Sequence, residues 1–304
     1  MPDLEACTAS QGVQGADEKQ AIIVIEYYTD PLCSWSWAFE APWRRLRYEY
    51  AGQLAWHYRM GGLLPDWESY ADPLNEIHSP AQMGPQWFQV GELSGMPLDP
   101  RLWQVDPPDS SYPACLAVKA AEVQGQQCAE NYLRRLRVAA LLEGRNIARQ
   151  EELFALADEI AASRGVQTFD SARFRADYAA PACMEALRQD LRDAAYVDIG
   201  RFPTLLLHHR GGRSLILVGY RPYSALQAAL EHLEPRLERR ADLPPAELAL
   251  AYTTHWGSIT AREVAEVLDG KTARAEALLE DLVRGGRLTK LAGKNGPVPL
   301  YAPC

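Results

Sequence analysis

A chain of 304 residues, 47% of them hydrophobic, is long enough to bury one large core or two smaller ones. Its net charge of −9 argues against general attraction to nucleic acid or to an anionic membrane surface. No run of about eighteen apolar residues occurs, so no transmembrane helix is expected.

Residues 1–20 are polar and acidic, and we expect them to form a flexible tail. They lack the basic and apolar regions of a signal peptide, so the sequence predicts a cytoplasmic protein. The cysteines have neither paired nor metal-ligand spacing, and the histidines have no ligand spacing. We therefore expect free thiols in a reducing compartment, no disulfide framework and no metal site. The six cysteines are Cys7, Cys33, Cys115, Cys128, Cys183 and Cys304.

The first predicted unit is a strand, a helix and a second strand. Residues 21–28 form a nearly continuous apolar run, which is typical of a strand buried on both faces. Residues 35–50 carry apolar side chains at helical spacing, and residues 53–60 have the composition of a strand that Gly61 and Gly62 end. This order predicts a right-handed βαβ unit.

A long helical segment is predicted to interrupt the sheet. Residues from about 65 to 198 contain no convincing strand, and prolines break their first part into short helices and loops. Strands are expected again at 201–208 and 213–219 around a Gly-Gly turn, followed by a helix at 222–233. The fold class is therefore α/β, with one domain over 21–235 and a charged linker at 236–245.

The last segment, 246–304, has a pattern of its own. Three predicted helices precede two short strands around a glycine-rich turn, which is typical of a winged helix. Seven Lys or Arg balance seven Asp or Glu, and three of the acids lie on the predicted third helix. A DNA-binding domain normally has a basic excess, so we expect this domain to contact a protein or to dimerise.

The candidate chemistry centres on Cys33, where a strand passes into a helix. The unpaired N–H groups and the positive end of the helix dipole would favour a thiolate there, so the sequence predicts a lowered pKa for Cys33. The motif Cys33-Ser34-Trp35-Ser36 has a serine where a dithiol motif has its second cysteine. Ser36 would then place a hydroxyl within reach of the thiolate.

These features resemble the DsbA-like branch of the thioredoxin superfamily over about residues 21–235. The resemblance rests on the segment 30–40, on the block 200–204 and on the start of a helix at 113–121. It is strongest with the cytosolic FrnE and SpxH (YjbH)-like group, which contains disulfide oxidoreductases and the adaptor that presents the regulator Spx to the Clp protease. The fold implied is thioredoxin-like with an all-helical insertion.

The resemblance also implies roles for single residues. Pro203 would be cis and face Cys33, and Phe202 and Thr204 would line the substrate edge with it. Trp35 would be a binding platform beside the thiol. A buried acid for proton transfer is expected near Glu26, although a salt-bridged strand acid is an equal alternative. Cys33 and Ser36 would be the catalytic residues, and Cys115 would be either a distant resolving thiol or a buried one.

The missing second cysteine leaves three functions open. Monothiol exchange is the first, in which a protein thiol, or glutathione as co-substrate, resolves a mixed disulfide on Cys33. The second resembles the kappa-class glutathione transferases and 2-hydroxychromene-2-carboxylate isomerases, although these have serine at the position of Cys33. The third is a non-catalytic adaptor that binds a protein partner. The main prediction is the single-cysteine, DsbA-family oxidoreductase-like protein, with no bound cofactor and with neither membrane nor nucleic acid as partner.

Overall fold

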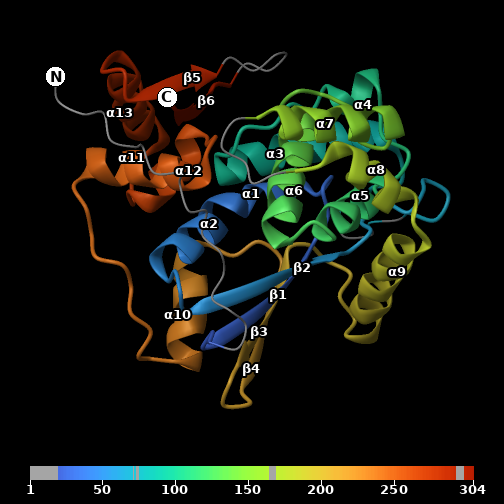
Figure 1. Cartoon of the computed structure of the whole chain (residues 1–304), viewed down its shortest axis with the longest axis horizontal. Coiled ribbons are helices and arrows are strands. Elements are labelled where there is room, and N and C mark those ends of the chain that lie inside the picture. The colour runs from blue at the N-terminus through green and yellow to red at the C-terminus, as the bar shows by residue number, and fades with distance from the viewer. Residues whose placement is uncertain (1–19, 71, 73–74, 164–168, 292–297) are drawn as a thin grey trace.

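The computed structural model describes residues 20–70, 72, 75–163, 169–291 and 298–304 (Figure 1). Its main sheet has four strands in the order β2-β1-β3-β4: Ile23–Thr29 is β1, Leu54–Met60 is β2, Thr204–His209 is β3 and Ser214–Val218 is β4. β1 pairs with β2 in parallel and with β3 antiparallel, and β4 continues antiparallel at the edge. The predicted tail 1–20 and Cys7 lie outside the described residues, apart from Gln20.

The alternation of side chains along β1 decides where the core lies. Ile23, Ile25 and Tyr27 are completely buried, whereas Val24 and Glu26 on the opposite face are partly exposed. The buried face is covered by helices α2 (Glu40–Glu49) and α10 (Tyr223–Leu233), which pack against each other. Because β-branched and aromatic side chains from both layers meet there, this face supplies most of the burial that holds the sheet.

The helix expected over 35–50 is two helices. Short helix α1 (Ser34–Ala38) ends at Phe39, and α2 begins at Glu40. Pro42 explains the break, because it has no N–H to donate to the carbonyl of Ala38. In the first turn of α2 that missing donor costs nothing. The one-helix prediction was therefore wrong at this point.

Between β2 and β3 the described residues form helices joined by loops, with one isolated β-bridge between Asp72 and Ile77, so the helical insertion is present as predicted. The prediction of short helices and loops before residue 95 was partly wrong, because α3 is one continuous helix despite Pro85. Burial of Met83, Trp87 and Val90 on one side of α3 offsets the hydrogen bond that Pro85 removes. The insertion comprises α3 (Pro80–Ser94), α4 (Leu102–Val105), α5 (Tyr112–Glu122), α6 (Gln126–Leu141), α7 (Gln150–Ala162), α8 (Ser171–Ala179) and α9 (Pro181–Tyr196).

Residues 245–304, called the C-terminal module here, contain three helices and a two-stranded sheet. The helices are α11 (Pro245–Trp256), α12 (Ala261–Val267) and α13 (Thr272–Arg284), and the strands are β5 (Leu288–Leu291) and β6 (Leu300–Pro303). The predicted turn at 293–296 lies outside the described residues. Thr260 and Glu263 form a reciprocal capping box at the start of α12.

The module packs directly onto the first domain. Helix α2 runs between α12 and α10, so its two sides contact different parts of the chain (Figure 1). All ten residues of α2 are buried as a result. No helix within the described ranges is long and apolar enough to cross a membrane.

Candidate functional site

Cys33 lies at the N-cap of α1, at the end of the turn that follows β1. Its Sγ accepts a hydrogen bond from the backbone N–H of Ser36 at 3.3 Å. It also lies 3.5 Å from the carbonyl oxygen of Phe202, to which the thiol can donate. Both partners come from backbone, so the fold fixes the sulfur between the start of a helix and the segment before β3.

The segment opposite Cys33 contains the predicted proline. The Phe202–Pro203 peptide bond is cis. The Pro203 carbonyl accepts from the N–H of Gly219, and the Thr204 hydroxyl donates to the Arg201 carbonyl at 2.7 Å. The structure therefore brings Phe202 and Pro203 to Cys33, while Thr204 ties the turn that presents them.

Gly61 provides the space for the Phe202 ring. A Cβ at this position would lie 2.0 Å from Phe202 Cζ, far inside van der Waals contact. The Gly61 N–H donates to the Thr29 carbonyl at 2.8 Å, which extends the β1–β2 pairing by one residue. Gly61, predicted from the sequence as part of a strand end, thus also leaves room for Phe202 at the site.

Trp35 and Ser36 behave differently from each other. Trp35 is partly exposed, and its ring lies 5.7 Å from that of Tyr220, just beyond β4. Ser36 is completely buried, and its hydroxyl has no hydrogen-bond partner within the part of the chain that the structure describes. Trp35 therefore borders the site as an accessible aromatic, and Ser36 acts on the Cys33 thiol through its backbone N–H and through its side chain, both of which lower the pKa of the thiol.

The pKa of Cys33 is raised, which corrects the prediction of a lowered one. Only 5% of Cys33 is exposed, and this burial raises the pKa of the thiol. Contacts with Ser36 and the positive charge of Arg137 lower the pKa, but burial outweighs them. The prediction from the helix start gave the wrong direction for the pKa shift of Cys33, because the sequence could not show how completely Phe202 and its neighbours cover the sulfur.

A buried acid lies beside Cys33, but it is Asp30. One carboxylate oxygen of Asp30 accepts from the backbone N–H of Leu32, and the other accepts from Leu63 N–H and from the Ser111 hydroxyl, all within 2.8 Å. Burial raises the pKa of Asp30, while these hydrogen bonds lower it. Sequence reasoning missed this residue, although an Asp three positions before the cysteine was the available signal.

Cys115 belongs to the same cluster. Its thiol donates to Asp30 at 3.3 Å, and the side chain is completely buried. Burial and the charge of Asp30 raise the pKa of Cys115 well above its ordinary value. No disulfide joins the five described cysteines, of which only Cys304 is exposed. The structure thus places Cys115 at the site as a hydrogen-bonded buried thiol.

Glu26 is not part of this arrangement. It forms a 3.0 Å ion pair with Arg59, which also contacts Asp190 on α9. The Glu26 side chain is 27% exposed on the face of β1 away from the core. Of the two roles weighed for Glu26, the structure therefore displays that of the salt-bridged strand acid.

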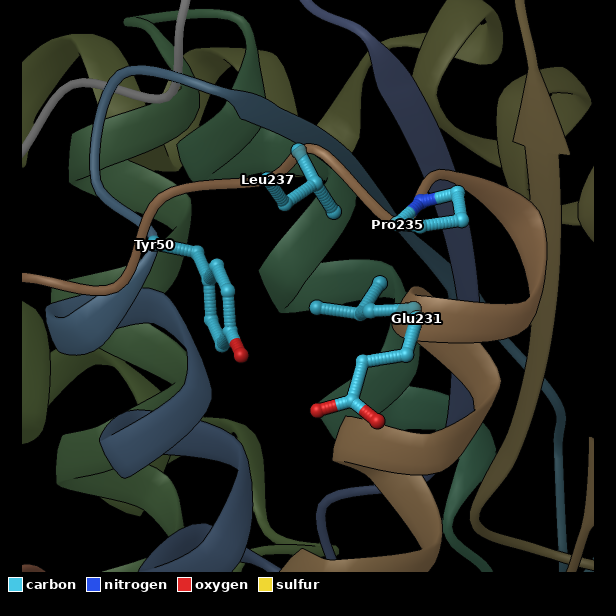
Figure 2. A pocket seen from close by; sticks show the side chains of 5 residues that line it. Tyr50, Glu231, Pro235 and Leu237 are labelled. Atoms are coloured by element: carbon cyan, nitrogen blue, oxygen red, sulfur yellow. The ribbon is translucent and has the colours of Figure 1, made fainter.

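A separate hollow lies at the other end of α2. Its wall is formed by Tyr50, Leu230, Glu231, Pro235 and Leu237 (Figure 2). Glu231 is the one ionisable group besides a tyrosine, so this lining offers no nucleophile. Among the described residues no group of three or more His, Cys, Asp or Glu is placed to hold a metal ion.

Comparison with known proteins agrees with this fold. A family model described as Thioredoxin matches residues 27–228, about two thirds of the chain. The chain belongs to the thioredoxin family. Its helical insertion gives it a DsbA-like fold, and it is similar to SpxH proteins over most of its length.

The curated relatives of this thioredoxin-family chain match nearly its whole length. The ClpXP adapter protein SpxH of Halalkalibacterium halodurans is 29% identical over 276 residues, which cover 90% of this chain and 87% of the relative. SpxH of Bacillus subtilis is 24% identical over the same shares of the two chains.

Solved structures of the thioredoxin fold match a smaller part. A putative protein disulfide isomerase from Nitrosomonas europaea is 22% identical, covers 69% of this chain and 96% of its own, and has a TM-score of 0.56. The cytosolic disulfide reductase DsbM of Pseudomonas aeruginosa is also 22% identical, covers 69% and 97%, and has a TM-score of 0.51. At this identity the two structures establish the fold alone.

Proposed function

We propose that this protein is an SpxH-like adaptor, which binds a protein partner and presents it to a ClpXP-type protease. The observation that carries the proposal is the extent of the SpxH similarity. An alignment over 90% of a 304-residue chain must reach into the C-terminal module. At least the first part of the module is therefore shared with proteins named as adapters, beyond the thioredoxin-type region at 27–228.

The state of Cys33 supports binding over turnover. A thiol with a raised pKa is mostly protonated near neutral pH and is a weak nucleophile. Ser36 cannot release a mixed disulfide, and the nearby Cys115 is bound to Asp30 with a pKa raised further. A protein that only binds at this site needs neither a thiolate nor a resolving thiol.

The binding surface that we propose includes the exposed edge of the sheet beside the site. β4 is an edge strand, and its Ile216 and Val218 side chains are 47% and 38% exposed. Unpaired backbone groups on such a strand can bind an extended peptide. Trp35 and the Phe202–Pro203 segment would border the bound chain. We propose that the C-terminal module is a winged helix that contacts protein, and that the adaptor acts in the cytoplasm.

A reconstituted degradation assay tests the adaptor function. Purified ClpXP would degrade an Spx-type substrate with and without this protein, and with its Cys33→Ser variant. We expect both forms to accelerate degradation by a similar factor, because binding does not use the thiolate. A cognate adaptor serves as positive control. The proposal would be contradicted if neither the wild-type protein nor the Cys33→Ser variant accelerated degradation.

A second candidate is monothiol exchange with glutathione as co-substrate. The observation that favours it is the Ser36 N–H donated to Cys33 Sγ, which is the contact a thiolate would need. Mass spectrometry of protein incubated with oxidised glutathione tests this candidate. A mixed disulfide on Cys33 that forms rapidly and is reduced catalytically would favour it over the adaptor. The transferase or isomerase alternative stays a prediction.

A further inference from the structure

Five charged side chains form a buried cluster behind the Cys33 site, which we call the buried arginine network. Three are arginines and two are glutamates, and they come from α2, α6 and α12. The completely buried Glu263 and Arg137 mark its two ends. The members are Glu40, Arg44, Arg134, Arg137 and Glu263.

The network connects the C-terminal module to the first domain. Glu263, in the first turn of α12, accepts from Arg44 at 3.1 Å and from Arg134 at 2.8 Å. The same carboxylate accepts the Thr260 N–H at 2.7 Å, so it caps its own helix while it binds both arginines. The Glu263 side chain is completely buried, and the two arginines that bind it are at most 10% exposed, so residues of α2, α6 and α12 together fix the geometry of this contact.

The other end of the network reaches the strand that carries the site. Arg44 and Arg134 also bind Glu40, at 2.9 and 3.5 Å, and Arg137 binds the second oxygen of Glu40. Arg137 then donates to the hydroxyl of Thr29, the last residue of β1. Asp30 follows Thr29 directly, and its carbonyl accepts the Cys33 N–H. A continuous series of contacts therefore runs from Glu263 to the Cys33 turn.

The network carries an excess of positive charge. Three guanidinium groups face two carboxylates, which leaves one formal positive charge in a region of low dielectric constant. Arg137 is the member whose charge favours the Cys33 thiolate. Among the other ionisable groups near the site, the charge of Asp30 raises the pKa of Cys33, and the Cys33 thiolate in turn raises the pKa of Tyr27 and of Tyr70.

We propose that Glu263 of the C-terminal module is a positioning residue for the Cys33 site and acts on the thiol through the buried arginine network. Its carboxylate offsets part of the positive charge behind the site and orients the arginines that hold Glu40. Removing this negative charge leaves two formal positive charges there, which stabilises the thiolate. The module thereby sets how reactive Cys33 is, although it supplies no atom to the site. This inference does not depend on the adaptor function.

The test is the pH profile of Cys33 alkylation in the full-length protein, followed on the Cys33 peptide by mass spectrometry. We expect Glu263→Gln to raise the rate at pH 7 by roughly three- to tenfold and to move the profile to lower pH. Glu40→Gln changes the charge in the same sense and should shift the profile in the same direction. Glu276→Gln is the matched control, because it removes an exposed charge from α13 of the same module.

Loosened packing in Glu263→Gln could also expose Cys33 and raise its alkylation rate. A second variant separates loosened packing from the charge effect, because the two predict rate changes of opposite direction. Arg134→Met removes a positive charge, and we expect it to lower the alkylation rate. The double variant Glu263→Gln with Arg134→Met restores the charge balance, so its profile should return to within about twofold of the wild type. The proposal is overturned if both single variants raise the rate, if the double variant is faster than either, or if Glu263→Gln matches Glu276→Gln.

Discussion

At the scale of single residues, the site is governed by how tightly Cys33 is covered. Two effects of opposite sign act on its thiol: hydrogen bonding at a helix start favours the thiolate, and burial favours the thiol. Burial prevails because the Phe202 segment lies directly over the sulfur. The same cover that weakens the nucleophile gives the site a defined wall of backbone and aromatic surface.

Gly61 offers a way to lift this cover. Gly61→Ala places a methyl group inside the present position of the Phe202 ring, so the ring must move and Cys33 becomes more accessible. We expect faster alkylation of Cys33 and a lower Tm in this variant. Gly200→Ala is the matched control, since nothing lies within 4 Å of a Cβ added there. Equal alkylation rates in the two variants would show that Phe202 does not shield the thiol.

Several residues of the site were predictable, and others were not. Cys33, Phe202 and Pro203 follow from a motif at a strand-to-helix turn and from its resemblance to known proteins. Asp30 was not assigned, because its partners Leu63 and Ser111 lie 33 and 81 residues away in sequence and only the fold brings them to the carboxylate. Ser111 and Arg137 come from the insertion, where local pattern indicates a helix but not what the helix faces.

At the scale of elements, α2 is the helix on which the two parts of the chain meet. Sequence periodicity predicted one apolar face for it and could not indicate that its arginines are also buried. Arg44 and Arg45 bind Glu263 and Asp269 of the C-terminal module, and Arg47 lies over the rings of Trp56 and Trp256. Charged residues spaced along a helix are usually solvated, so only the tertiary contact reveals their role.

His255 at this interface should make stability depend on pH. Burial, together with the charges of Arg47, Arg240 and Arg44, lowers the pKa of His255 to about 3, and its ring packs edge-on against Tyr48. The unfolded chain takes up this proton near pH 6.5, whereas the folded chain resists it until about pH 3. The contribution of His255 to the free energy of unfolding is therefore fully present above pH 6.5. It is lost as the pH falls from about 6.5 towards 3.

Substitution of His255 by Phe should remove that dependence. The aromatic contact with Tyr48 is retained, and the buried Nε2, which has no hydrogen-bond partner among the described residues, is eliminated. In urea unfolding at pH 7 and pH 5 we expect wild type to lose more stability than His255→Phe. His232→Asn, at an exposed histidine on α10, serves as control. Identical losses in wild type and His255→Phe would rule out His255 as the source.

At the scale of the whole molecule, a thioredoxin-type domain and a second module share one continuous set of buried contacts. The order of strands and helices was largely predictable, because hydrophobic period, glycines and prolines act locally. The packing of the module onto the first domain was not predictable, since it depends on pairs such as Arg44 with Glu263, which are 219 residues apart in sequence. These buried contacts hold the module in a fixed position relative to the thiol site, which suits the adaptor function proposed above.

The pH dependence of Cys33 alkylation in the wild-type protein tests most directly whether the site binds rather than reacts. The rate would be measured from pH 5 to pH 11 on the Cys33 peptide, with the unfolded chain as reference for an ordinary thiol. We predict a midpoint above that of the unfolded chain and slow reaction at pH 7, because burial disfavours the thiolate. A midpoint below that of the unfolded chain, with rapid reaction at neutral pH, would contradict the account and restore Cys33 as a catalytic nucleophile.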